Sequence, residues 1–242
     1  MKVGPKLVFL FNDPEGFGAA IYDAVQPRPN SFFQRSKESF ELSLGRYGIE
    51  DHKACGDIVH FTDGNGQLSV SMLLMQYCEP PILACAVNEV LGLITEENLL
   101  TTMTLTLPFV VPSSKLKSEE KNASMDNKIT IYGAQVGPEA EFTHALISKV
   151  QGMPPSLQIH YEPLACLLHF VRVLKFPTAL LIGQRGQHLS SKAPREELEV
   201  VCEMGQILAS SFSLCFAEER VKLNLGKSSK LAEEQPWRAL YG

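Results

Sequence analysis

The sequence contains no apolar stretch long enough to cross a bilayer, which would take about 20 consecutive residues. The first apolar run, residues 7–11, is also too short for the core of a signal peptide, which takes about 7–15 residues. We therefore expect a soluble, intracellular protein of the cytoplasm, with the nucleus left open as a further compartment, and no membrane partner.

An excess of positive charge is missing as well. The chain carries 22 Lys and Arg residues against 27 Asp and Glu residues, and the basic residues are scattered rather than gathered in a stripe. The sequence therefore lacks the clustered basic residues that usually accompany electrostatic binding to nucleic acid or to anionic lipid. We expect neither of them as a partner.

The six cysteines include no pair with the C-x-x-C spacing of many metal and redox sites. Most of them lie inside apolar runs, which predicts reduced, buried thiols. Cys166 and His169 stand three residues apart on a predicted helix and could present two metal ligands. No second pair at ligand spacing follows, so a core cysteine beside a partly buried histidine is the favoured interpretation. No metal or other cofactor is expected.

Motifs that bind phosphate are equally scarce. Gly16 and Gly18 follow the first predicted strand, as in a dinucleotide-binding turn, but the third glycine of that motif is absent. Asp13 and Glu15 would also place negative charge beside a phosphate. Tight packing of the strand against the following helix is the favoured alternative for these glycines.

Two further groups of polar residues could carry chemistry. Asp57, His60 and Asp63 lie near a predicted strand, but a strand places Asp57 and His60 on opposite faces, so we interpret all three as surface groups. Arg185 and His188 follow a buried strand, where ligand sites of α/β proteins tend to lie, and are candidate anion binders, with a solvated loop as the alternative. Neither group sets a nucleophile beside a base at a catalytic spacing, so we expect no enzyme.

The order of the apolar patterns predicts an α/β fold. Apolar runs that are continuous or alternating predict strands, and runs with a period of about 3.6 residues predict helices. Residues 63–66 predict a hairpin turn that uses its glycines for positive φ, residues 102–107 a half-buried strand, and residues 27–54 stay unassigned. Consecutive strands in the middle of the chain, with helix and strand alternating at the ends, predict a mixed β-sheet covered by helices. The predicted strands are residues 7–11, 58–61, 68–75, 82–87, 102–107, 129–132, 178–182 and 221–225, and the predicted helices are residues 17–25, 163–174 and 194–215.

With 242 residues, 45% of them hydrophobic, the chain fits one large domain. We assign residues 1–225 to this domain and interpret residues 112–128, which are polar and without period, as an exposed loop that the fold does not need. Residues 226–242 hold too few large apolar side chains to offset the entropy of ordering, which predicts a flexible C-terminal tail.

The tail nevertheless ends in apolar and aromatic residues. Leu240, Tyr241 and the terminal carboxylate of Gly242 offer an aliphatic group, an aromatic ring and a negative charge, which a lysine-rimmed pocket on another protein could hold. The alternative is an end that folds back onto its own domain or frays.

Residues 161–182 combine a predicted helix, which ends at Lys175-Phe176-Pro177, with a buried strand, and this block resembles the corresponding segment of the proteasome assembly chaperone 1 family. Residues 58–87, 103–111, 112–128 and 141–147 have counterparts in the same order. Leu240-Tyr241-Gly242 matches the C-terminal hydrophobic-Tyr-any motif that this family shares with proteasome activators. The chain departs from the family at residues 27–54 and 186–199.

The resemblance implies a non-enzymatic chaperone for assembly of the 20S proteasome core particle. Such a chaperone pairs with proteasome assembly chaperone 2, scaffolds the α-ring as this heterodimer, and docks its C-terminal tail between α subunits. An α/β enzyme or small-ligand-binding protein that uses residues 16–18 or 183–188 stays open, as does an adaptor of another complex. A deep concave pocket at the strand ends would favour a ligand-binding protein, and a broad, shallow apolar face would favour docking.

Overall fold

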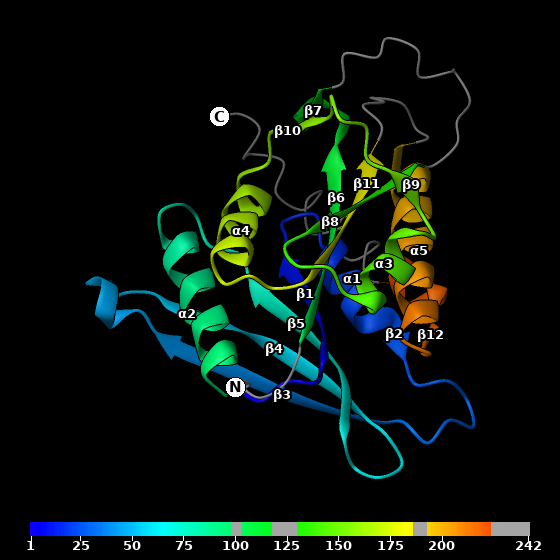
Figure 1. The fold of residues 1–242 in the computed structure, drawn as a ribbon, viewed down its shortest axis with the longest axis horizontal. Helices are drawn as coiled ribbons and strands as arrows, with labels where there is room; N and C mark the ends of the chain where they lie inside the picture. Colours follow the sequence, from blue (N-terminus) through cyan, green and yellow to red (C-terminus); the bar gives the residue numbers. More distant parts are fainter. Residues whose placement is uncertain (98–102, 118–129, 186–192, 224–242) are drawn as a thin grey trace.

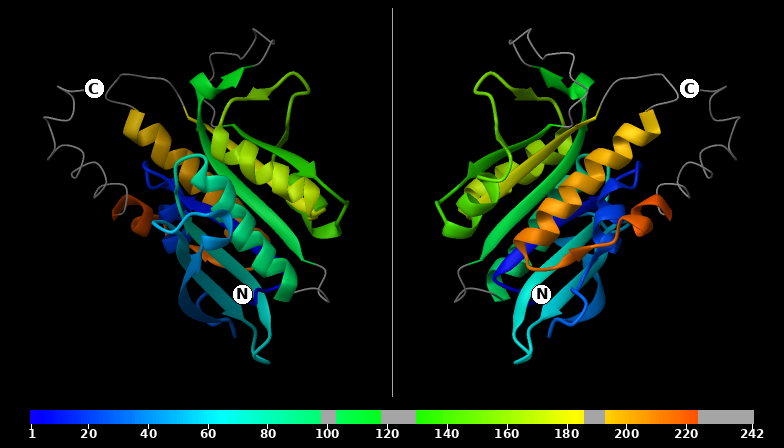
Figure 2. Two further views of the ribbon diagram at one scale, coloured as in Figure 1. Left: turned by 90° about the vertical axis from the view of Figure 1, so that its left-hand side faces the viewer. Right: turned by 90° about the vertical axis from the view of Figure 1, so that its right-hand side faces the viewer.

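The structure is a computed structural model that describes residues 1–97, 103–117, 130–185 and 193–223. A large mixed β-sheet lies between two layers of helices (Figure 1 and Figure 2), which confirms the predicted α/β class with a sheet covered by helices. The eight strands of this sheet follow the order β3, β4, β5, β1, β6, β11, β8, β9. Their bounds are β1 Lys6–Asn12, β3 Gln34–Ser43, β4 Lys53–Thr62, β5 Leu68–Gln76, β6 Thr104–Pro112, β8 Ile131–Val136, β9 Gln151–Gly152 and β11 Thr178–Arg185. The helices are α1 Phe17–Ala24, α2 Ile82–Glu97, α3 Glu141–Ile147, α4 Glu162–Val173 and α5 Ala193–Ser211, and the short elements are β2 Val25–Gln26, η1 Gly45–Tyr47, η2 Ser113–Lys115, β7 Leu116–Lys117, β10 Gln158–Ile159 and β12 Cys215–Phe216.

The four central strands, β5, β1, β6 and β11, run parallel, whereas β3 and β4 on one side and β8 on the other add antiparallel pairings. Central parallel strands are covered on both faces, so they read as continuous apolar runs. In β1, Leu7 and Phe9 belong to one hydrophobic core and Val8 and Leu10 to the other. The predicted strand at residues 7–11 is therefore a central strand.

Each core lies under its own helices. Helices α2 and α4 cover the first core with an apolar face that includes Leu83, Val87 and Leu167, while α1 and α5 cover the second core with Ile21 and Leu208 among others. These helices bury the apolar residues of one face, as the 3.6-residue period requires. No helix among the described residues is long and apolar enough to cross a membrane.

The predicted strand at residues 82–87 is wrong, because this segment is the first half of helix α2. Its buried residues recur at three- and four-residue intervals as far as Ile94, so the apolar run belongs to a helix of 16 residues. A short apolar run has the same composition in a buried strand and in a buried helix, and only its continuation separates the two. Residues 95–97 are the end of α2.

The expectations for β6 and for residues 221–225 also need correction. Strand β6 is buried on both faces rather than half-buried, because it lies in the middle of the sheet, between β1 and β11, where helices cover both faces. Its Thr104 and Thr106 are buried too. Residues 218–223 are helical instead of extended, with Val221 buried and Leu223 exposed. An alternation of so few residues does not distinguish a strand from one turn of helix.

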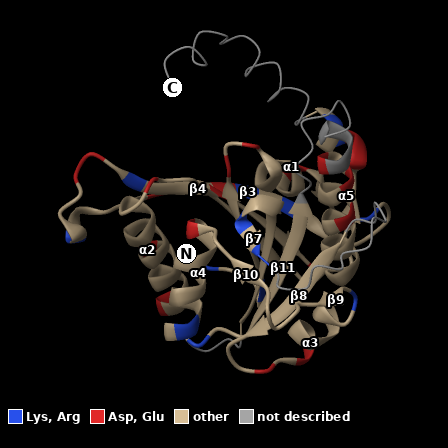
Figure 3. Ribbon diagram, turned by 90° about the horizontal axis from the view of Figure 1, so that it is seen from above, with Lys and Arg blue, Asp and Glu red and all other residues tan. Residues whose placement is uncertain are grey.

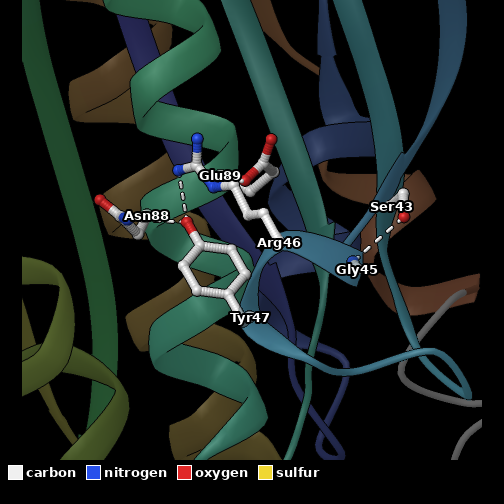
Figure 4. A network of polar contacts seen from close by, with 6 residues as sticks. All are labelled: Ser43, Gly45, Arg46, Tyr47, Asn88 and Glu89. Carbon is white, nitrogen blue, oxygen red and sulfur yellow. Dashed lines mark hydrogen bonds and ion pairs between the residues drawn. The ribbon is translucent and has the colours of Figure 1, made fainter.

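The segment that the sequence left unassigned forms the edge strand β3 and the short helix η1, which contacts α2 (Figure 4). The Arg46 Nε lies 2.7 Å from a Glu89 carboxylate oxygen, and the Asn88 side chain donates a hydrogen bond of 2.7 Å to the Tyr47 hydroxyl. Leu44, just before η1, is fully buried. These contacts attach the connection between β3 and β4 to the helix that covers their end of the sheet.

The remaining predicted elements correspond to strands and helices of the structure. Strands β4 and β5 form the predicted hairpin, although of its two glycines only Gly66 has a positive φ, 77°. The predicted polar loop at residues 112–128 is shorter than expected, because β6 extends to Pro112 and residues 116–117 form β7, while residues 118–128 lie outside the described residues. All six cysteines are free thiols, but each is partly exposed rather than buried.

Candidate functional site

The four parallel strands end on the same side of the sheet, and Figure 3 views the molecule from that side. In open α/β sheets, ligands bind beyond the carboxyl ends of the strands, because the connecting loops and helix N-termini meet there. Here this region receives the turn between β1 and α1, the segment after β5, the short helix η2 after β6, and the first turn of α4. It is therefore the first place to look for a site.

The turn between β1 and α1 is occupied by a side chain of the chain itself. One Asp13 carboxylate oxygen accepts a hydrogen bond of 3.0 Å from the Phe17 backbone N–H, and the other accepts one of 2.7 Å from the Gly18 N–H. These N–H groups at the start of α1 are the donors that a dinucleotide-binding turn offers to phosphate. Burial raises the pKa of Asp13, against the opposing effect of the two N–H donors. The anion position of this turn is thus filled by a carboxylate.

The glycine at the second helical position has a packing role. A Cβ atom at Gly18 would lie 1.9 Å from the backbone oxygen of Phe11, so α1 can approach β1 this closely only with glycine there. The cavity beside this turn, lined by Asp13, Phe17 and Gly18, holds about 20 Å³, which is room for about one water. This geometry supports the interpretation of Gly16 and Gly18 as strand-to-helix packing.

A larger cleft lies next to this turn, with a volume of about 730 Å³. It runs between the start of α1, the segment after β5, and the region where η2, β10 and α4 come together. Its polar and aromatic lining comes from four segments that are far apart in the sequence: Glu15, Tyr77 with Glu79, Lys115, and His160 with Tyr161 and Glu162. The volume falls within the range of about 300–1,000 Å³ that is typical of ligand pockets.

Tyr161, which lines the cleft, connects to the first hydrophobic core through a series of aromatic ring contacts. The ring centroids of Phe9 and Phe11 lie 5.4 Å apart, those of Phe11 and Phe109 6.0 Å, and those of Phe109 and Tyr161 5.9 Å. Such edge-on and tilted contacts fix ring orientations in a packed core. Tyr161 is therefore held in place at the cleft by core packing.

The rim of the cleft, in contrast, is open to solvent. Glu15, Glu79, Lys115 and Glu162 are all exposed, and Tyr77 and Tyr161 are partly buried. Burial raises the pKa of the Tyr77 hydroxyl, and the nearby carboxylates of Glu79 and Glu162 raise it further. Three carboxylates against a single ammonium group give this cleft an acidic character.

The structure does not bring the other predicted site residues together for catalysis. His169 is exposed rather than partly buried, with its ring edge-on to Phe170 at 5.8 Å, and Cys166 on the same helix is partly exposed. Within the described part of the chain, no group of three or more His, Cys, Asp or Glu residues is placed to hold a metal ion.

The interpretation of His60 as a surface group is wrong. Its side chain is 5% exposed, and its Nδ1 lies 2.8 Å from the Ser71 hydroxyl, which in turn accepts a hydrogen bond of 2.9 Å from the Gly4 N–H. Burial lowers the pKa of His60. Asp57 instead lies 2.9 Å from the Lys37 ammonium, and Asp63 accepts hydrogen bonds from the backbone of its own turn. The three residues thus have separate structural roles.

The remaining candidates fall at or beyond the limits of the described residues. Arg185 is the last residue of β11, and His188 lies outside the described residues. Leu240, Tyr241 and Gly242, the predicted docking residues, lie outside them too. The cleft residues Tyr77, Glu79 and Lys115 were not predicted as a site, since the only sequence signal for them is a polar residue soon after a strand.

The family described as a domain of unknown function, DUF7894, matches the chain over residues 1–242. No curated protein matches the chain. Among solved structures, a Mycobacterium tuberculosis protein of unknown function is similar with a TM-score of 0.54 and 13% identity over 96% of this chain and 78% of that one. PbaB, an archaeal proteasome activator from Pyrococcus furiosus, is similar with a TM-score of 0.50 and 9% identity over 96% of this chain and 93% of that one. PbaA from the same organism, an archaeal homologue of proteasome-assembly chaperone, gives a TM-score of 0.46 and 13% identity over 96% and 90% of the two chains.

Proposed function

The chain belongs to the DUF7894 family, and we propose that this protein is a non-enzymatic chaperone for assembly of the 20S proteasome core particle. In this proposal residues 1–225 form the chaperone domain and residues 226–242 a flexible docking tail. The chain pairs with proteasome assembly chaperone 2, binds the proteasome α-ring and docks its tail between α subunits in the cytoplasm, with the nucleus left open as a further compartment.

The observation that carries the proposal is the agreement of two independent features. The fold is similar to that of the archaeal proteasome activator over almost the whole of both chains. The last three residues, Leu240-Tyr241-Gly242, match the hydrophobic-Tyr-any ending on which the sequence resemblance to proteasome assembly chaperone 1 rests. A fold is shared by many functions, so the tail supplies the more specific part of the argument.

The chemistry of the tail suits a pocket between subunits. Burying Leu240 and the ring of Tyr241 would contribute roughly 1.5–3 kcal/mol each. Pairing the terminal carboxylate with a lysine would contribute about 1.5–3 kcal/mol more, before the ordering of the tail is subtracted. The tail alone therefore binds weakly. The domain raises the effective concentration of the tail at its pocket and makes the attachment strong but reversible.

The competing proposal, a nucleotide-binding enzyme that uses residues 16–18, is disfavoured by Asp13. Its carboxylate already accepts the two N–H groups that a phosphate would need, so a phosphate would have to displace it and approach a negative charge. The cleft beside it has an exposed rim, whereas sites for small molecules enclose about 70–90% of the ligand surface. Both observations favour contact with another protein.

The proposal is tested by affinity capture of the tagged protein from cells, followed by mass spectrometry. Proteasome α subunits and one related chaperone should dominate the captured proteins. Deleting residues 240–242, or the substitution Tyr241→Ala, should abolish or strongly reduce capture of the α subunits without changing the melting temperature, because a flexible tail adds little to the stability of the domain.

A variant with several residues added after Gly242 tests the role of the terminal carboxylate separately from that of the side chains. It keeps Leu240 and Tyr241 but moves the negative charge, so it should also bind poorly. Normal capture of α subunits by the truncated chain would refute tail docking. Absence of proteasome subunits from the wild-type capture would refute the proposed function as a whole.

A further inference from the structure

Docking of the C-terminal tail makes no use of the acidic cleft, which has charged and aromatic side chains of its own. We propose that it binds the arginine side chain of an extended peptide segment on a partner protein, with the guanidinium group between the two tyrosines and the rim carboxylates. This inference does not rest on the proposed function, because it concerns the chaperone domain alone and needs no proteasome subunit.

The charge of the lining points to a cationic ligand. Glu15, Glu79 and Glu162 line the cleft with Lys115 as the one ammonium group, so the side chains that are charged at neutral pH have a net charge of −2. The other polar side chains of the lining, Tyr77, Tyr161 and His160, add no further carboxylate. Glu162 also occupies the first turn of α4, where the helix dipole would otherwise attract an anion.

The aromatic residues favour a flat cation over a compact one. Tyr77 lies near both Glu79 and Glu162, whose charges act on its hydroxyl group, so an aromatic ring and two carboxylates are available to the same ligand. A guanidinium group stacks on an aromatic ring and donates paired hydrogen bonds to a carboxylate, whereas an ammonium group is a compact and more strongly hydrated charge. Tyr161 is fixed by its contact with Phe109, so it needs little ordering on binding.

The size and the remaining lining favour a peptide over a free amine. A cleft of about 730 Å³ is much larger than one side chain, and Pro14, Ile159 and Ala165 supply apolar surface beside the charged groups. An extended peptide would place its arginine at the tyrosines and its neighbouring residues on this apolar surface. A small amine would leave most of the cleft in contact with water.

The test uses the purified full-length chain and fluorescence polarisation with a labelled pentapeptide that has arginine at its centre and alanine elsewhere. Two companion peptides carry lysine or the uncharged isostere citrulline at the centre. The arginine peptide should bind with a dissociation constant below about 1 mM. Its affinity should fall on raising NaCl from about 50 to about 500 mM. The lysine and citrulline peptides should bind at least several-fold more weakly.

Paired variants locate the site. The double substitution Glu79→Gln with Glu162→Gln should weaken arginine-peptide binding by on the order of tenfold or more, since it removes two charged acceptors. Glu203→Gln is the control for a loss of negative charge away from the cleft, because Glu203 is exposed on α5, on the opposite face of the sheet. This control should change the affinity less than twofold.

A wild-type experiment keeps the inference testable even if the double variant unfolds. An arginine peptide with a photoreactive group should attach to residues 77–79 or 159–163. Equal binding of the citrulline or lysine peptide would overturn the assignment to arginine. The cleft itself would be excluded as the site by attachment elsewhere, by equal weakening in the Glu203→Gln protein, or by no binding at millimolar peptide.

Discussion

The substitution Gly18→Ala separates the packing role of this glycine from a role in ligand binding. The added methyl carbon would meet the Phe11 backbone oxygen at 1.9 Å, far inside the ~3.5 Å at which non-bonded heavy atoms attract each other. A backbone atom of a central strand cannot rotate away as a side chain can. Helix α1 would therefore have to move away from β1, and the contacts between Ile21 and the second core would loosen.

The expected cost of this shift follows from measurements on overpacked cores, about 1–3 kcal/mol, and the rigid backbone neighbour places Gly18→Ala in the upper part of that range. For a chain of this length, 2–3 kcal/mol lowers the melting temperature by roughly 4–12 °C. Gly92→Ala is the matched control, because Gly92 lies within α2 and a Cβ atom there meets no other atom within 4 Å. It should stabilise the protein by about 0.5–1 kcal/mol through the better helix propensity of alanine.

Chemical denaturation in urea measures both variants under identical conditions. We expect the midpoint of Gly18→Ala to fall and that of Gly92→Ala to rise, with similar slopes. A Gly18→Ala protein as stable as the wild type would show that α1 does not lie this close to β1. The packing explanation of the glycine turn would then be wrong.

Three further predictions follow from the turn, the buried histidine and the polar loop. Asp13→Ala should destabilise the domain by about 1–2 kcal/mol because it leaves two N–H groups of α1 without their acceptor, and Asp13→Asn, which keeps one acceptor oxygen, should cost less in the same urea assay. Because burial lowers the pKa of His60, the unfolded chain binds more protons than the folded one below pH ~6.5, so the free energy of unfolding should fall as the pH drops from ~7.5 towards the folded pKa. His60→Gln should flatten this dependence and exposed His52→Gln should not, so an unchanged pH profile in His60→Gln would contradict the assignment. Replacing residues 118–128 by a few Gly and Ser residues, with β7 kept, should leave the melting temperature unchanged, and loss of soluble protein would mean that this segment is part of the fold.

The sequence alone was enough to predict those elements whose buried faces show in the spacing of their own apolar residues. The continuous run of β1, the apolar period of α1, the hairpin of β4 and β5, and the succession of α4 and β11 were all predicted, because each pattern directly reports which faces of its own element are covered. The α/β class followed from the order of these elements. The amino acids near residues 13–18 also predicted that phosphate would meet negative charge there, and Asp13 occupies that position.

Only the tertiary structure decided which elements are neighbours. Strand β6 is buried on both faces because of what packs against it, and its neighbours in the sheet, β1 and β11, lie far away in the sequence on either side. The cleft has the same origin, since Glu15, Tyr77, Lys115 and Tyr161 come from four separate segments. A local pattern shows that a face is buried but carries no information on its partner, because contacts between distant segments depend on how all the elements pack at once. The same limit explains His60, a polar residue whose burial depends on other segments of the chain. Its Nδ1 lies 2.8 Å from the Ser71 hydroxyl, which accepts a hydrogen bond from the Gly4 N–H.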